Sequence, residues 1–283
     1  MSLKKNSNST LKANIEEHPF HLVNSSVWPL AVSLSLYNLF ISLIGYFNYF
    51  DMGYLHINVI YNFTLYSPIL YLIILLFFKT KWFIDIVREA TYEGYHTSAV
   101  QTGIYYGMCL FILSEIMFFF SFFWAFFHIS WSPNIYLGLL LPPQSLNLLD
   151  PFGLPLWNTI ILVSSGITIT YAHRGIIAGS RYVSLDGLYW TVLYGFLFTC
   201  IQAYEYSYSN YSINDGVFGS LFFLLTGFHG IHVIIGAIFL TICLYRLIEY
   251  HFTIQHHVGL ELSILYWHMV DAIWLFLFLS VYL

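Results

Sequence analysis

The chain has 283 residues, of which 59% are hydrophobic and 8% charged, and its formal net charge is −5 at pH 7. With a mean hydropathy of +0.72, it has too few polar side chains to cover a water-soluble globule, so the composition predicts a protein embedded in lipid. The charges form no basic cluster of the kind that binds nucleic acid, which argues against a nucleic-acid partner.

A polar tail, residues 1–26, begins the chain and lacks the apolar core and cleavage site of a secretory signal, so we expect it to be retained. Seven apolar stretches follow, each long enough to cross a hydrocarbon core of about 30 Å as a helix. The second stretch is interrupted by polar residues and by Pro68. The predicted spans are 27–47, 54–78, 100–128, 154–173, 188–204, 217–245 and 262–282.

The distribution of Lys and Arg between the two sides of the membrane supports the count of seven spans. With seven crossings, all nine Lys and Arg residues fall on the side of the N-terminus, whereas removing one interior crossing would scatter them. Because Lys and Arg collect on one side of a membrane protein, we expect the N-terminus on this basic side and the C-terminus opposite. The nine residues are Lys4, Lys5, Lys12, Lys79, Lys81, Arg88, Arg174, Arg181 and Arg246.

The hydrophilic segment 79–99 is the largest connection on the basic side. We interpret it as a connecting loop between a two-helix unit, residues 27–78, and a five-helix bundle, residues 100–283. The predicted fold class is therefore an all-α polytopic membrane protein. Gly103 and Gly107 form a GxxxG step, and further glycines lie along the sixth span, a pattern that predicts close contacts between helices.

Glu115 lies about 22 Å along the third span at 1.5 Å per residue, which is deep in the bilayer. An unpaired charge at that depth costs roughly 2.5 to 3.5 kcal/mol, so the acid needs a partner or a proton. Candidate partners are His229 and His232, three residues apart on the sixth span. Two interpretations stay open: a polar tie between the third and sixth spans, and a route for protons or ions through Glu115.

The seventh span carries His268 and Asp271, whose spacing predicts a buried polar pair on one helix face. Of the twelve histidines, only this one and the two of the sixth span lie deep, too few for paired haem ligands or a haem–copper centre. The three cysteines are far apart, which excludes a CxxC pair and a disulfide framework. We therefore expect no metal and no catalytic residue in this chain.

A set of cationic and aromatic residues near the basic side could converge on a phospholipid headgroup, with cations meeting the phosphate and a ring lying at the glycerol level. The alternative is that these charges only set the topology. The set consists of Trp82, Arg88, His96, Arg246 and His251.

Four segments resemble the haem–copper oxidase subunit III family, that is, cytochrome c oxidase subunit III. They are HPFHLVNSSVWPL (18–30), the stretch from FIDIVREATYEGYH to FFWAFFH (83–128), TGFHGIHVIIGAIFL (226–240) and the C-terminal segment from HFTIQHHVGLELSILYWHMVD (251–283). There are departures: LLPPQSL keeps Pro142 and Pro143 without the usual flanking Trp and Gly, and Glu249 stands where animal relatives have a basic residue.

The resemblance implies a two-plus-five arrangement of seven helices around a lipid-filled V-shaped cleft. It implies a core subunit of the respiratory terminal oxidase, complex IV, which transfers electrons from cytochrome c to oxygen and pumps protons. The expected roles are structural stabilisation, lipid binding, and assistance with proton uptake or oxygen access. Glu115 matches the family's carbodiimide-reactive acid, and the headgroup set matches positions associated with lipid.

The resemblance also implies partners and a location. Haem a, haem a3 and copper are expected in partner subunits I and II, and accessory subunits, a respiratory supercomplex and bound phospholipid (cardiolipin, phosphatidylglycerol or phosphatidylethanolamine) are the other expected associates. The expected location is the mitochondrial inner membrane, with the N-terminus in the matrix and the C-terminus in the intermembrane space. The alternatives are an independent transporter centred on Glu115, which the few deep acids disfavour, and a quinol oxidase subunit III.

Overall fold

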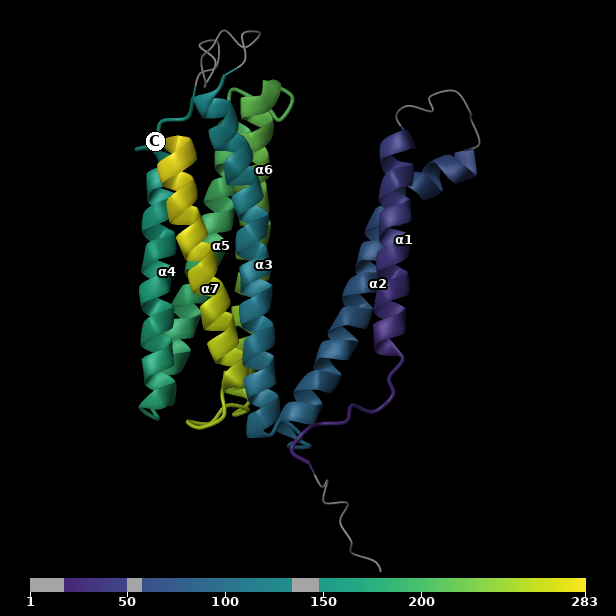
Figure 1. Ribbon diagram of the computed structural model, residues 1–283, viewed down its shortest axis with the longest axis vertical. Coiled ribbons are helices and arrows are strands. Elements are labelled where there is room, and N and C mark those ends of the chain that lie inside the picture. The colour runs from purple at the N-terminus through teal and green to yellow at the C-terminus, as the bar shows by residue number, and fades with distance from the viewer. Residues whose placement is uncertain (1–17, 50–57, 134–147) are drawn as a thin grey trace, which may run out of the picture. The chain divides into compact units, whose positions relative to one another are not determined.

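The computed structural model describes residues 18–49, 58–133 and 148–283. Their regular structure consists of α-helices and one closing π-helical turn (Figure 1), which confirms the all-α prediction. The elements are α1 (Trp28–Tyr49), α2 (Asn58–Thr91), α3 (Ser98–Trp131), α4 (Leu154–Ile177), α5 (Arg181–Tyr208), α6 (Gly216–Ile248), α7 (Val258–Leu277) and η2 (Phe278–Tyr282). The departure noted at Pro142 and Pro143 lies outside the described residues.

Six of the seven helices in the described part of the chain are long and apolar enough to cross a membrane. The exception is α2, which corresponds to the predicted span interrupted by polar residues and which contains Pro68. Figure 1 shows α2 bent near its beginning. Proline removes a backbone hydrogen bond from a helix and commonly bends it, so a bend agrees with this residue.

The helix α2 extends well past the predicted end of the second span. Residues 79–91, which the sequence placed in the connecting loop 79–99, form its last turns, so the loop prediction was wrong for that part. No glycine or proline interrupts KTKWFIDIVREAT, and a helix can continue beyond the hydrocarbon core with its own hydrogen bonds satisfied. The chain then turns at Gly94, whose φ of 70° suits glycine.

The chain divides into two compact units, residues 1–103 and 104–283. In the first unit, α1 packs against α2. The buried residues between them include Ser35, Ser42 and Ser67, and such small residues let two helix backbones approach closely. The indole Nε1 of Trp28 also donates a hydrogen bond of 2.5 Å to the carboxylate of Asp85, which joins the start of α1 to α2.

In the second unit, two tryptophans of α7 form the centre of the core. Trp267 and Trp274 are both fully buried, at 0% exposure. Each indole nitrogen donates to a hydroxyl of α4: Trp267 to Ser165 at 2.8 Å and Trp274 to Thr159 at 3.0 Å. A buried tryptophan needs a partner for its N–H, so these bonds fix the position of α7 against α4.

Only some of the predicted glycine contacts are present. A Cβ atom at Gly236 of α6 would lie 2.9 Å from the Trp267 ring, and one at Gly195 of α5 would lie 2.7 Å from it, so both glycines allow this ring to fit. A Cβ atom at Gly103 or Gly107 would meet no described atom within 4 Å, so close packing at this GxxxG step stays a prediction.

Candidate functional site

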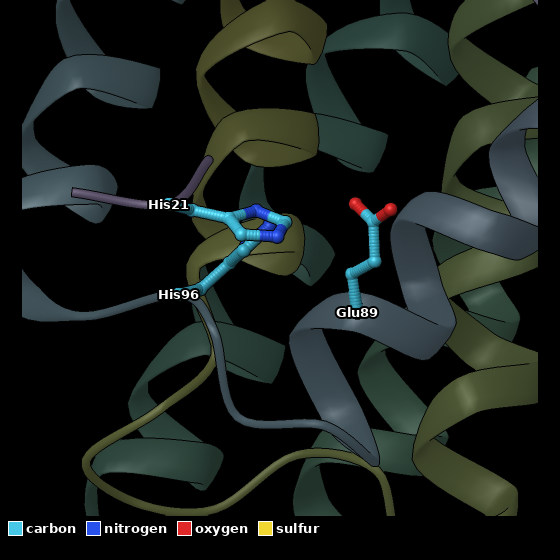
Figure 2. A group of neighbouring side chains, drawn as sticks. All are labelled: His21, Glu89 and His96. Atoms are coloured by element: carbon cyan, nitrogen blue, oxygen red, sulfur yellow. The ribbon is translucent and has the colours of Figure 1, made fainter. Parts of the chain in front are cut away.

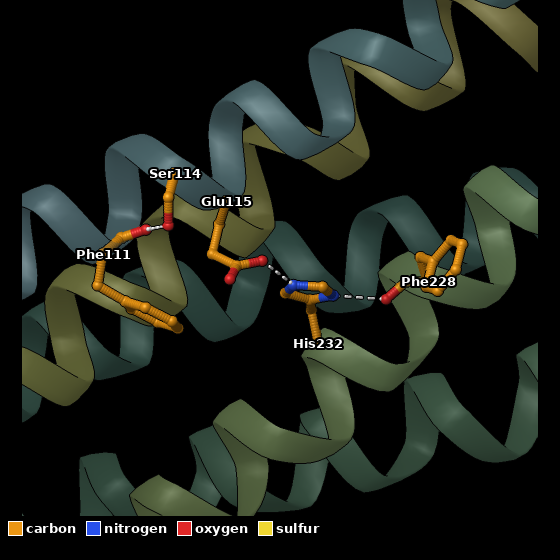
Figure 3. A network of polar contacts seen from close by, with 5 residues as sticks. All are labelled: Phe111, Ser114, Glu115, Phe228 and His232. Carbon is orange, nitrogen blue, oxygen red and sulfur yellow. Dashed lines mark hydrogen bonds and ion pairs between the residues drawn. The ribbon is translucent and has the colours of Figure 1, made fainter. Parts of the chain in front are cut away.

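The carboxylate of Glu115 on α3 contacts the imidazole of His232 on α6. The distance from Oε2 to Nε2 is 2.7 Å (Figure 3), and the two side chains are 22% and 12% exposed. The chain thus contains a polar contact between the third and sixth helices, involving one of the two partners expected from the sequence.

The second nitrogen of His232 determines how protons are distributed in this pair. Nδ1 lies 2.7 Å from the backbone carbonyl oxygen of Phe228, one turn earlier on α6. A carbonyl oxygen can only accept, so Nδ1 carries a hydrogen. Nε2 must then either donate to a carboxylate, as part of an imidazolium, or accept from a protonated carboxyl group. A carboxylate facing an unprotonated Nε2 would place two lone pairs 2.7 Å apart.

Both arrangements place one proton between Glu115 and His232 and leave the pair without net charge. This explains how an acid can lie at mid-membrane depth without the cost of an isolated charge. Aromatic rings surround the imidazole: the centroid of Phe119 is 4.9 Å from that of His232, and Tyr266 stacks at 6.4 Å. Surroundings of low polarity strengthen the hydrogen bond.

The neighbouring hydroxyl of Ser114 does not join the pair. It donates to the backbone carbonyl of Phe111 on its own helix at 2.6 Å (Figure 3). No hydrogen bond continues from the Glu115 carboxylate to a third side chain among the residues that the structure describes.

His229 does not contact Glu115, so the prediction for this residue was wrong. It is fully buried, and its Nε2 lies 3.3 Å from the backbone carbonyl of Val270 on α7. Its ring centroid is 5.0 Å from that of Trp274. Positions three apart differ by about 60° around a helix, enough for His232 to face α3 while His229 faces the core.

The predicted buried pair on α7 is only half present. Asp271 is buried at 9% exposure, whereas His268 is exposed, and no hydrogen bond joins the two within the described chain. The Asp271 carboxylate lies against α4, where a Cβ atom at Gly166 would be 2.8 Å from Oδ2. Nδ1 of His268 would lie 3.9 Å from the same Cβ position, so both side chains approach one place on α4 without a hydrogen bond between them.

Glu205 is a buried acid that the sequence interpretation missed. It is fully buried near the end of α5 and accepts a hydrogen bond of 2.6 Å from the Tyr282 hydroxyl. Beside it, Gln202 accepts a hydrogen bond of 3.2 Å from the Asn158 amide. The fifth span was predicted to end at residue 204, which placed Glu205 outside the bilayer. The sequence feature that could have pointed to this buried acid is the i,i+3 spacing of Gln202 and Glu205 directly after an apolar run.

The residues predicted to bind a lipid headgroup belong to different units. Trp82, Arg88 and His96 lie in the first, and Arg246 and His251 in the second. The Arg88 side chain forms an ion pair of 3.1 Å with Glu93, and the Arg246 guanidinium lies over the ring of Phe252 at 4.5 Å. Convergence of the five residues on one headgroup stays a prediction.

Two groups of side chains in the described chain could hold a metal ion. One consists of His21, Glu89 and His96 (Figure 2), and the other of His173, His257 and Glu261. In each group the ligand atoms lie within 4.8 Å of one another. In the second group, His257 and Glu261 already form a contact of 3.0 Å. The sequence interpretation considered only histidines deep in the spans and therefore identified neither group.

Apolar helices long enough to cross a membrane, with a shared-proton carboxylate–imidazole pair between two of them, define this protein as a polytopic all-α membrane protein. The family model described as cytochrome c oxidase subunit III matches residues 18–283. The chain belongs to the cytochrome c oxidase subunit III family.

Individual relatives agree over nearly the full length. Cytochrome c oxidase subunit 3 of Chondrus crispus is 43% identical over 274 residues, covering 97% of both chains. The Prototheca wickerhamii protein of the same name is 47% identical, covering 95% of this chain and 98% of its own. That of Neurospora crassa is 48% identical, covering 96% and 97%. The chain is therefore part of the oxidase complex and associates with other oxidase subunits.

Proposed function

We propose that this chain is a structural core subunit of the oxidase, with no haem or copper of its own, and that it stabilises the neighbouring catalytic subunit. In this proposal the Glu115–His232 pair ties α3 to α6 and keeps the bundle in shape. The observation that carries the proposal is the 2.7 Å contact between the two side chains, with the other imidazole nitrogen held by the Phe228 carbonyl.

The surroundings of the pair favour a tie over a proton route. A route needs further polar groups that pass the proton on, and the described hydrogen bonds of Glu115 end at His232. The rings beside the imidazole are aromatic, and the Ser114 hydroxyl is engaged with its own helix. The proton can therefore move between Glu115 and His232, but no described side chain passes it on.

The finer expectations form part of the same proposal. Haem a, haem a3 and copper belong to subunits I and II, and phospholipid headgroups are bound on the basic side, which faces the mitochondrial matrix. Arg88 and Arg246 lie in the last turns of α2 and α6, where a cation interacts favourably with the helix C-terminus. If every helix crosses the bilayer, these two helix ends lie on the same side of the membrane. Both arginines can then bind headgroups of the same lipid leaflet.

A double-mutant cycle tests the tie. We expect the variants Glu115→Ala and His232→Ala each to lower the free energy of unfolding of the purified chain in detergent, and the double variant to reveal a coupling energy of about 0.6 to 1.7 kcal/mol, the range for hydrogen bonds between membrane helices. Each single change strands the other polar group in an aromatic environment.

The control for this cycle pairs Ser114→Ala with His232→Ala. The Ser114 hydroxyl bonds only to its own helix, so we expect these two changes to add without coupling. A Glu115–His232 coupling no larger than that of the control pair would show that the contact does not tie the helices together.

A further inference from the structure

Three side chains of the first unit bring metal-ligating atoms together at one place. His21 precedes α1, Glu89 lies in the last turns of α2, and His96 lies in the connection from α2 to α3. Their ligand atoms lie within 4.8 Å of one another, and Figure 2 shows both imidazoles beside the Glu89 carboxylate. All three side chains are partly exposed, so an ion can reach them from water.

The segment that carries His21 is fastened to the α2–α3 connection. The hydroxyl of Thr97 donates a hydrogen bond of 2.5 Å to the Pro19 carbonyl. The ring of His21 stacks on Tyr95, with centroids 4.5 Å apart and an angle of 6° between the planes. These two contacts set the position and the ring plane of the first histidine without any contribution from an ion.

The other two members are positioned by hydrogen bonds to their own backbone carbonyls. The Tyr95 amide donates to the Glu89 carbonyl at 3.1 Å, which closes the turn after α2. The side-chain amide of Gln101 donates to the His96 carbonyl at 2.8 Å. The three ligands therefore come from a scaffold that is already formed, which reduces the ordering cost of binding.

The carboxylate of Glu89 makes no hydrogen bond or ion pair with another side chain in the described residues, including the two histidines. The adjacent guanidinium of Arg88 pairs with Glu93 instead, at 3.1 Å. The carboxylate thus lies near two imidazoles without bonding to them. Ligand bonds of about 2.0 to 2.2 Å place neighbouring ligand atoms roughly 3 to 3.5 Å apart, so small side-chain rotations would close this group around an ion.

We propose that His21, Glu89 and His96 bind one divalent cation of the zinc class. Two imidazoles and one carboxylate suit zinc and similar borderline cations, and three protein ligands leave a fourth position for water. The ion would join the segment before α1 to the end of α2 and the start of α3. The site goes beyond the proposed scaffold function. It assigns His96 to the ion and leaves the other residues of the expected headgroup set for phospholipid.

The test uses the full chain in lipid nanodiscs, stripped of metal with a chelator and titrated with Zn²⁺ against a chromophoric competitor. A His257→Gln background removes the other candidate group. We expect one bound equivalent, and His21→Gln and Glu89→Gln should each weaken its binding by about tenfold or more. The matched control is His18→Gln, an exposed histidine of the same segment outside the group, which should leave the affinity unchanged.

A second measurement leaves all three proposed ligands unchanged. X-ray absorption by Zn²⁺ bound to the His257→Gln chain should show two imidazole ligands and one carboxylate. Affinity unchanged in both His21→Gln and Glu89→Gln would overturn the proposal. So would fewer than two imidazoles in the absorption spectrum, or the lack of any bound equivalent of Zn²⁺ in the titration.

Discussion

Replacing Trp267 by alanine should lower the free energy of unfolding of the chain by about 3 to 5 kcal/mol, the usual cost of removing a large buried aromatic side chain. The indole is fully buried and lies against Gly195 and Gly236 on two other helices. Loss of the indole would also remove the hydrogen bond of 2.8 Å that the Ser165 hydroxyl of α4 now accepts from the indole N–H. Contacts among α4, α5, α6 and α7 would weaken together.

The matched control is Trp131→Ala at the end of α3. This tryptophan is 78% exposed, so its removal should change stability by no more than about 0.5 kcal/mol. Unfolding of the purified chain in a denaturing detergent, followed by circular dichroism, measures both variants. Equal losses of stability would show that Trp267 is not the centre of the core.

Adding a side chain opposite the same ring should also be strongly destabilising. We expect Gly236→Val to cost about 1 to 3 kcal/mol, because overpacking forces a rigid neighbour to move. A Cβ atom at this position would lie 2.9 Å from Cε3 and 3.1 Å from Cζ3 of Trp267. The ring cannot move away easily, because Gly195 lies close to Cη2 and Cζ2 of the same ring and the indole N–H is bonded to Ser165.

The control for this change is Gly230→Val on the same helix. A Cβ atom there would meet no described atom within 4 Å, so valine should be tolerated and should even gain slightly in helix propensity over glycine. Thermal midpoints of the two purified variants, measured by the fraction that stays monodisperse after heating, give the comparison. A midpoint for Gly236→Val as high as that for Gly230→Val would contradict the close packing of α6 on Trp267.

Helix lengths and depths could be predicted from the sequence because they depend on local quantities. The length of an apolar run and the rise of 1.5 Å per residue place Glu115 and His232 at similar depths, and the structure brings them into contact. To tell which of His229 and His232 contacts Glu115, one must also know how α6 is rotated about its axis. That rotation depends on packing against α7, where His229 meets the Val270 carbonyl.

Other features arise from tertiary contacts that a linear pattern does not contain. Glu205 was missed because α5 continues to Tyr208 and its last turn is covered by Tyr282 from the other end of the chain. The group of His21, Glu89 and His96 depends on a turn that folds the N-terminal segment over the end of α2. Whether a glycine makes a close helix contact likewise depends on which neighbouring helix packs against it.

In the proposed scaffold, Glu115 ties two helices together and does not conduct protons to the oxidase. The direct measurement is proton release per electron by the Glu115→Gln oxidase reconstituted in vesicles, beside its oxygen consumption. A glutamine amide can still donate to Nε2 of His232, so the account predicts an assembled complex with wild-type turnover and an unchanged proton-to-electron ratio. A fully assembled Glu115→Gln complex that consumes oxygen but releases fewer protons per electron would contradict it.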